Sequence, residues 1–257
     1  MRKIIARIFI CICFISCMMP EMLNAQKNKP LNMPLYDNEP YHFGYIIGYN
    51  QMWFSPKFVT NFQNIEYDGK EGSAYFDQLN DTISINSKYN INDISQSLPF
   101  GMSVGVVGNL RLAKYFDLRL IPTISWGETS ITYKGKSLGT EKEFSQTFSI
   151  HNVYLELPLQ FKYRSKRYNN TAAYVIFGAN NKINFTAKKF DIKLKRYDFA
   201  PEIGTGFDFY TGEFKFGIEI KMSYGLRNMI DPENLTPLTN SFDKLKNKMF
   251  QLSFTLE

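Results

Sequence analysis

The side chains that most often carry catalysis or bind metals are sparse in this chain of 257 residues. The two histidines, His42 and His151, are far apart in the sequence, and no His-Glu-x-x-His pattern is present. Zinc sites need three or four nitrogen or sulfur ligands at defined spacing. The sequence therefore predicts no metal site and no cofactor, and both histidines are expected to be ordinary residues near strand ends.

Serine-based catalysis has little support in the sequence. A catalytic serine needs a neighbouring base and an orienting acid, and no Gly-x-Ser-x-Gly pattern occurs. Because such triads are assembled in space, a barrel hydrolase that uses Ser103 or Ser223 with His151 remains a remote alternative. The main prediction is that the chain is not an enzyme.

The first 25 residues have the pattern of a secretory signal peptide. Arg2, Lys3 and Arg7 form a basic start, and an apolar run over 8–19 follows. That run is too short to cross a membrane as a stable helix. Small residues offer a cleavage site after Ala25, so we predict an exported protein whose signal peptide is removed.

The cysteines and prolines near the N-terminus add two expectations. All three cysteines, Cys11, Cys13 and Cys17, lie within the signal, so the mature chain should contain neither a disulfide nor a reactive thiol. Cleavage before a lipid-bearing Cys17, as in a lipoprotein, is the alternative processing route. Residues 26–40 contain three prolines among polar residues and predict an irregular periplasmic leader.

Charge and composition exclude several classes of protein. The formal charge of +6 is modest, and no basic stripe or recognition module accompanies it, so nucleic acid is not an expected partner. No second apolar run is long enough for a transmembrane helix. The aromatic share of 16%, with 23 Phe and 16 Tyr, is typical of membrane barrels with aromatic girdles. A soluble β-sandwich is the alternative.

Strict alternation of apolar and polar residues is clearest in residues 214–224. A strand points successive side chains to opposite faces, so this segment has one apolar and one charged face. Its length is that of a transmembrane β-strand. The apolar positions are Phe214, Phe216, Ile218, Ile220, Met222 and Tyr224.

Similar patterns predict a barrel over residues 41–257. The predicted strands are 42–54, 98–111, 115–133, 146–164, 171–185, 196–210, 213–226 and 246–257. The predicted long loops are 55–97, 134–145, 186–195 and 227–245, and they alternate with short turns. This arrangement predicts an all-β fold: an eight-stranded antiparallel up-and-down transmembrane β-barrel of the outer-membrane type. Both termini should lie on the periplasmic side, where the turns are short.

Charged residues on the polar faces of these strands must point into the barrel. A charge at the membrane midplane costs about 2–4 kcal/mol on the lipid side. Eight strands leave an interior only wide enough for side chains, so we expect these acids and bases to pair inside, without an open pore. The candidate interior charges are Arg119, Glu156, Lys162, Glu202, Asp208, Lys215, Glu219 and Lys221.

Two basic clusters flank the predicted connections. Arg164, Lys166 and Arg167 adjoin a short turn and are the candidate docking patch for a periplasmic partner. The second cluster adjoins a long outer loop and would contact phosphates of lipopolysaccharide. Solvated surface charge is the alternative for both clusters. The outer cluster is Lys188, Lys189, Lys193 and Lys195.

A series of short stretches runs through the chain in a recognisable order. They are His42-Phe43-Gly44, Asn109-Leu110-Arg111-Leu112, Phe116-Asp117-Leu118-Arg119, Leu155-Glu156-Leu157-Pro158-Leu159, Lys162-Tyr163-Arg164-Ser165-Lys166-Arg167, Tyr174-Val175-Ile176, Tyr197-Asp198-Phe199, Gly204-x-Gly206-x-Asp208-Phe209-Tyr210, Phe214-Lys215-Phe216 and Lys221-x-Ser223-Tyr224-Gly225-Leu226. In order and spacing they resemble the PorT family, outer-membrane barrels of the type IX secretion system. The chain departs from many outer-membrane barrels at its end, Leu256-Glu257, which lacks a terminal aromatic residue.

The resemblance implies a part in exporting proteins across the outer membrane, with other secretion proteins of the outer membrane and periplasm as partners. Because eight strands cannot pass a folded protein, we expect an accessory or assembly role rather than a conducting pore. The alternative is a structural or adhesive barrel that binds ligands through the long loop 55–97. The aromatic residues of that loop are Tyr67, Tyr75, Phe76 and Tyr89.

Overall fold

The computed structural model describes residues 30–72, 76, 88–97, 99–139, 141–186, 194–231 and 238–257. The predicted signal peptide, the lipoprotein alternative at Cys17, and Lys188, Lys189 and Lys193 lie outside these residues. Within the described residues, no helix has the length and apolar character needed to cross a membrane.

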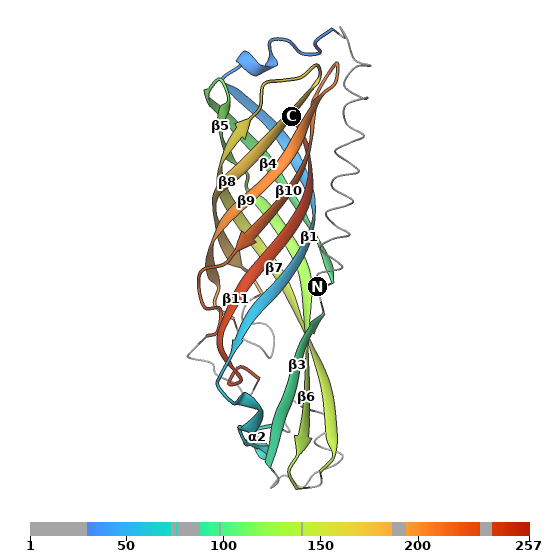
Figure 1. Ribbon diagram of the computed structural model, residues 1–257, viewed down its shortest axis with the longest axis vertical. Helices are drawn as coiled ribbons and strands as arrows, with labels where there is room; N and C mark the ends of the chain where they lie inside the picture. The colour runs from blue at the N-terminus through green and yellow to red at the C-terminus, as the bar shows by residue number, and fades with distance from the viewer. Residues whose placement is uncertain are drawn as a thin grey trace, which may run out of the picture.

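Antiparallel strands make up most of the described chain (Figure 1). The short helical segments are η1 (Tyr36–Asn38), η2 (Phe62–Asn64) and α2 (Gly69–Gly72). The strands are β1 (Tyr41–Phe58), β2 (Tyr67–Asp68), β3 (Lys88–Ser97), β4 (Phe100–Ala113), β5 (Phe116–Leu120), β6 (Thr123–Ser137), β7 (Glu143–Arg164), β8 (Thr171–Asn184), β9 (Tyr197–Tyr210), β10 (Lys215–Tyr224) and β11 (Phe242–Leu256).

The strands close into a ring. Strand β1 pairs with β11 on one side and with β4 on the other, and every other neighbouring pair between them is antiparallel. Strands β5 and β6 both lie between β4 and β7, and the break between them falls at Pro122, which has no N–H for the ladder. Counted as one interrupted strand, they give the ring eight positions. The predicted up-and-down barrel is confirmed.

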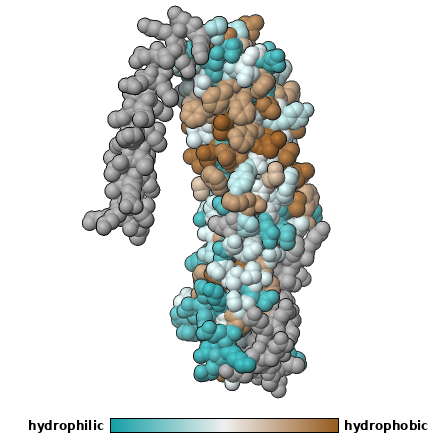
Figure 2. Space-filling view, turned by 90° about the vertical axis from the view of Figure 1, so that its right-hand side faces the viewer, coloured by the Kyte–Doolittle hydropathy of each residue, from teal (hydrophilic) through white to brown (hydrophobic). Residues whose placement is uncertain are grey.

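The two faces of strand β7 exchange character along its length. Near its start the outward residues are polar and the inward residues Phe144 and Ile150 are apolar. Beyond Asn152 the inward row contains Glu156 and Lys162, and the outward row is apolar. The outward apolar residues are Leu157, Leu159, Phe161 and Tyr163. Apolar side chains gather over the upper half of the molecule and polar ones over the lower half (Figure 2), so the lipid boundary crosses β7 near Asn152.

The lower, polar half of the molecule has an ordinary apolar core. Tyr67, Phe76 and Tyr89, which the sequence analysis assigned to a ligand-binding loop, lie within this core rather than on the surface. Tyr75 lies outside the described residues. The other buried members are Phe54, Ile91, Ile131, Tyr133, Phe144, Ile150, Leu194, Met229, Ile230, Leu238, Phe242 and Leu245.

Two of the predicted long loops contain strands instead. Strand β3 occupies 88–97 within the predicted loop 55–97, and β6 and β7 continue to Ser137 and from Glu143 within the predicted loop 134–145. The apolar inward residues of these extensions are buried in the apolar core of the lower half. Their burial stabilises strand pairing beyond the membrane. In the other two loops the described residues include a bridge between Leu194 and Ile230, and β11 begins at Phe242.

The described part of the leader, residues 30–40, lies across the end of the barrel opposite α2 (Figure 1). The same end carries the short connections between β4 and β5, between β7 and β8, and between β9 and β10. Short turns mark the periplasmic side of outer-membrane barrels. We therefore refer to this end as the periplasmic end and to the other as the outer end.

One pair of substitutions on β7 tests the boundary. Leu159→Arg places a charge on the lipid-facing row and should lower the free energy of unfolding by about 2–4 kcal/mol. Thr147→Arg, on the outward row of the outer half, should change it by less than about 0.5 kcal/mol. Urea unfolding from phospholipid vesicles, followed by the fluorescence of the two tryptophans, gives both values. Equal losses would contradict a boundary between the two positions.

Candidate functional site

The structure places all eight charges assigned to the interior inside the barrel, each no more than 4% exposed. They form a series of short ion pairs through the membrane half. Arg119 lies 2.6 Å from Glu219, and Lys162 lies 2.6 Å from Asp208. The remaining pairs are Lys221 with Glu202 at 3.7 Å, Lys182 with Glu156 at 3.6 Å, and Lys215 with Glu257 at 2.7 Å.

Two of these partners were missed in the sequence analysis. Lys182 is inward-facing on β8, in the same row as Asn180 and Asn184, and the two-residue period could have identified it. Glu257, noted only as an unusual terminal residue, turns its carboxylate to Lys215 and accepts a weak hydrogen bond from the Tyr36 hydroxyl at 3.4 Å. The interior is therefore occupied by paired side chains, as expected for a ring of this size.

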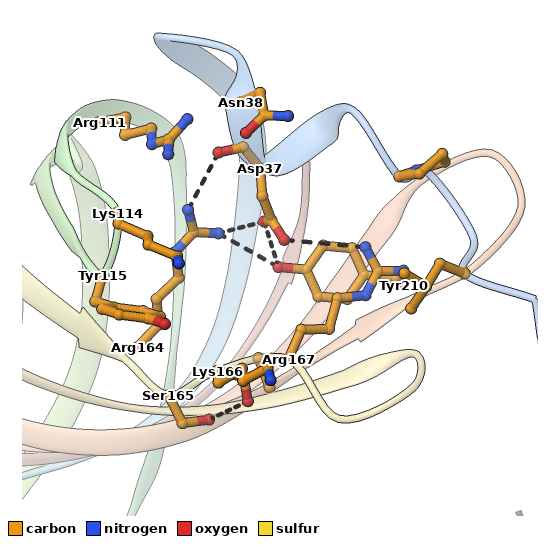
Figure 3. Close-up of a pocket in the computed structure, with 13 residues that line it drawn as sticks. Asp37, Asn38, Arg111, Lys114, Tyr115, Arg164, Ser165, Lys166, Arg167 and Tyr210 are labelled. Carbon is orange, nitrogen blue, oxygen red and sulfur yellow. Dashed lines mark hydrogen bonds and ion pairs between the residues drawn. The ribbon is translucent and has the colours of Figure 1, made fainter. Parts of the chain in front are cut away.

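The leader is bound to the periplasmic end through Asp37. Its carboxylate accepts hydrogen bonds from the Arg164 guanidinium and, at 2.8 Å, from the Tyr210 hydroxyl (Figure 3). Arg164 also lies 3.7 Å from Asp117, and it is only 7% exposed. Arg164 was predicted to face a periplasmic partner. It is instead occupied within the chain, because β7 continues its inward row to this residue.

Arg167 attaches the leader at a second point. Its guanidinium stacks on the Tyr210 ring at 3.8 Å and donates hydrogen bonds to the carbonyl oxygens of Asn32 and Met33. A third contact is the stacking of Tyr36 on His42, with ring centroids 3.8 Å apart. His42 is buried beneath the leader rather than lying free at a strand end. The leader is thus a structured cap.

Charge strengthens the attachment at Asp37. Burial alone would raise the pKa of this carboxyl, but the Arg164 and Arg167 guanidinium groups and the Tyr210 hydroxyl outweigh it and hold the pKa below its ordinary value. Asp37 is therefore ionised at neutral pH. A lowered folded-state pKa stabilises the attached leader above the ordinary pKa of Asp, and this stabilisation is lost as the pH falls below it.

A pocket of about 500 Å³ opens beside the cap. Arg111 lines it from near the end of β4, Lys114 and Tyr115 from the turn between β4 and β5, and Lys166 from the turn between β7 and β8. The leader contributes Asp37 and its neighbours. Lys166 is exposed, and its docking role stays a prediction. Arg111 and Lys114 also line the pocket, and the sequence analysis did not name them as candidates. The remaining lining residues are Leu31, Pro34, Asn38, Arg164, Ser165, Arg167, Ala172 and Tyr210.

The structure does not assemble the residues of the hydrolase alternative. Ser103 faces the interior and is hydrogen-bonded to Asn50 and Ser125, and Ser223 accepts a hydrogen bond from Lys182. His151 lies on the exposed outer face of β7, 3.6 Å from Glu128. The serines and the histidine are therefore on opposite faces of the barrel wall.

The described residues hold no group of three or more His, Cys, Asp or Glu side chains that could bind a metal ion. At the outer end, Lys195 precedes β9 and donates its backbone N–H to Met229 at 2.7 Å. Contact of its side chain with lipopolysaccharide phosphates stays a prediction.

The interior pairs can be tested with a single and a double variant. Arg119→Met leaves the Glu219 carboxylate buried without its cation, and we expect it to lower the free energy of unfolding by about 3–5 kcal/mol. Adding Glu219→Leu removes that unpaired charge and should recover most of the loss. Urea unfolding measures both values. A double variant no more stable than the single one would show that the buried pair is not the source of the loss.

The leader attachment can be tested with a spin label on Cys introduced for the exposed Leu35. In Asp37→Asn the label should be mobile at pH 7, because the contact with Arg164 loses its charge. In the wild-type sequence it should become mobile only as the pH falls below about 4, the ordinary pKa of Asp.

Glu39→Gln is the matched control for that experiment, since Glu39 is an exposed carboxylate two residues away that makes no contact with Arg164. Its label should stay immobile at pH 7. An Asp37→Asn label that remains immobile at pH 7 would refute the role of this carboxylate. The readout is the electron paramagnetic resonance line shape.

A comparison with protein-family models agrees with this architecture. The family model described as "Outer membrane protein beta-barrel domain" matches residues 24–231. Among solved structures, the chain is similar to Ail, the attachment invasion locus protein of Yersinia pestis, in complex with the heparin analogue sucrose octasulfate. That likeness has 11% identity and a TM-score of 0.35, and it covers 85% of this chain and 98% of Ail. A comparison with curated proteins gave no match. The chain therefore belongs to the outer membrane protein beta-barrel domain family, and it is an outer-membrane barrel protein.

Proposed function

We propose that this barrel is a non-conducting component of type IX protein secretion that works by binding periplasmic proteins at its leader-capped end. The observation that carries the non-conducting part is the row of paired, buried charges that occupies the membrane half of the interior. The sequence resemblance to the PorT family supplies the link to secretion.

The filled interior makes transport through this barrel physically unfavourable. A folded cargo protein would need an opening far wider than an eight-position ring provides. Passage of an extended chain would require separating several buried ion pairs at once, and each broken pair costs about 3–5 kcal/mol. An accessory or assembly role, with a separate conducting channel, is compatible with both constraints.

The periplasmic end offers the surface for such a role. Lys114 and Lys166 lie on turns that project from the membrane half, and Arg111 lies near the end of β4, on the side where periplasmic proteins can reach them. The cap holds a fixed arrangement of polar groups around this pocket. We infer that partners bind here, with the barrel as the membrane anchor.

A strain that lacks the chain should lose most secretion of type IX cargo into the medium. Restoring the chain without residues 30–40 should restore the barrel but only part of secretion, because the capped surface is incomplete. Restoring the Arg119→Met/Glu219→Leu variant should restore secretion fully, because the interior is not the route. Cargo in the medium is quantified by immunoblot, with barrel levels in outer membranes as the control.

Electrical recording provides the matching test of the interior. In planar bilayers the purified barrel should show no conductance of the size of a protein channel. Large, stable openings, or normal secretion in the strain that lacks the chain, would contradict the proposal.

Ligand binding at the outer end is the second candidate function. The observation in its favour is the outer half itself, which has its own apolar core and projects polar strands beyond the lipid boundary. A groove of about 390 Å³ on this half has three charged residues in its lining, Asp93, Lys134 and Glu143. Intact secretion combined with lost surface binding in the deletion strain would favour this alternative.

A further inference from the structure

The pocket at the periplasmic end has a surplus of positive charge. Its lining includes five cationic side chains and a single carboxylate, that of Asp37. Its volume of about 500 Å³ lies within the usual range of ligand sites, about 300–1,000 Å³. The cations are Arg111, Lys114, Arg164, Lys166 and Arg167.

These cations fall into two groups. Arg164 and Arg167 are engaged by the leader through Asp37 and through backbone carbonyl groups. Within the described part of the chain, Arg111, Lys114 and Lys166 have no carboxylate partner. The pocket therefore keeps three cationic groups for a ligand after the cap has bound.

The cap shows which chemistry the pocket accepts. The Asp37 carboxylate is a peptide side chain bound by a guanidinium and a tyrosine hydroxyl, with a second guanidinium 3.9 Å away (Figure 3). Clusters of arginine and lysine recognise acidic peptide motifs through charge-assisted hydrogen bonds. Arg111, Lys114 and Lys166 extend this arrangement beyond the leader.

We propose that the pocket binds a short acidic peptide segment of a periplasmic partner, whose carboxylates pair with Arg111, Lys114 and Lys166 beside the capped leader. The proposal rests on the proposed function and specifies the chemistry of its partner. The lining has two sources, because β4, β7 and the turns that follow them supply the cations and the leader supplies Asp37 and Asn38.

The test uses the full mature chain in nanodiscs of uncharged lipid and a fluorescent peptide of six residues with four glutamates. The wild-type barrel should bind it with an affinity that falls as salt rises. The Arg111→Gln/Lys114→Gln/Lys166→Gln variant should bind about tenfold more weakly or worse. A peptide with glutamine in place of glutamate should not bind.

The matched control removes three cations from the outer half instead. Lys57→Gln/Lys142→Gln/Lys244→Gln changes the net charge by the same amount, and its peptide affinity should stay within about twofold of wild type. A charge-preserving variant, Arg111→Lys/Lys114→Arg/Lys166→Arg, should keep binding, which separates lost charge from lost folding.

Three results would overturn the proposal: no binding by the wild-type barrel, equal losses in the pocket and control variants, or lost binding in the charge-preserving variant. Binding of vesicles with anionic headgroups but not of the peptide would also overturn it and would indicate a lipid site. If the peptide fails to bind while secretion still depends on the chain, only this inference fails and the proposed function stands. If secretion is independent of the chain but the peptide binds at the pocket, the site stands without that function.

Discussion

Charged side chains cannot face hydrocarbon without a large free-energy penalty, and this constraint organises the whole barrel. Strands β7 and β10 carry acids and bases on one face, and β9 carries acids on one face, so that face must turn inward. Inside, a lone buried charge would be equally unfavourable, and Glu219, Asp208 and Glu202 each lie within 4 Å of a base. The filled lumen follows from that pairing.

The apolar and polar faces of the strands exchange places where the strands leave the membrane. On β7 the inward row becomes apolar towards Phe144, and the outward row becomes polar. Water on the outside makes burial of apolar surface favourable again, so β6, β7 and β3 pair for several further residues around an ordinary core. Strand β7 therefore passes from lipid into water. The point at which its apolar residues change from the outward to the inward face locates the lipid boundary more directly than the length of the strand does.

Local periodicity was sufficient to predict the barrel and its inward charges, because alternation is set within each strand. It could not predict the partner of Arg164, since Asp37 is 127 residues away and no local pattern links them. The inward row of β7 does extend to Arg164, but grouping this residue with the exposed Lys166 as turn charge hid that fact. The part of the β6–β7 hairpin that extends beyond the lipid boundary was assigned to loops, because its polar outward residues outnumber its apolar inward residues. Whether those inward residues meet Tyr89 and Phe242 depends on the three-dimensional arrangement.

The occupied interior gives the capped end of the barrel its importance. A barrel whose lumen is occupied can act only through its two ends and its lipid-facing wall. At the periplasmic end, Arg164 belongs at once to the interior series, through Asp117, and to the surface, through Asp37. This double role fixes the leader on the rigid barrel instead of leaving it as a tether. Because side chains on a fixed frame lose little further entropy on binding, the groups that the fixed leader adds to the pocket are better placed for recognition than the same residues on a free leader would be.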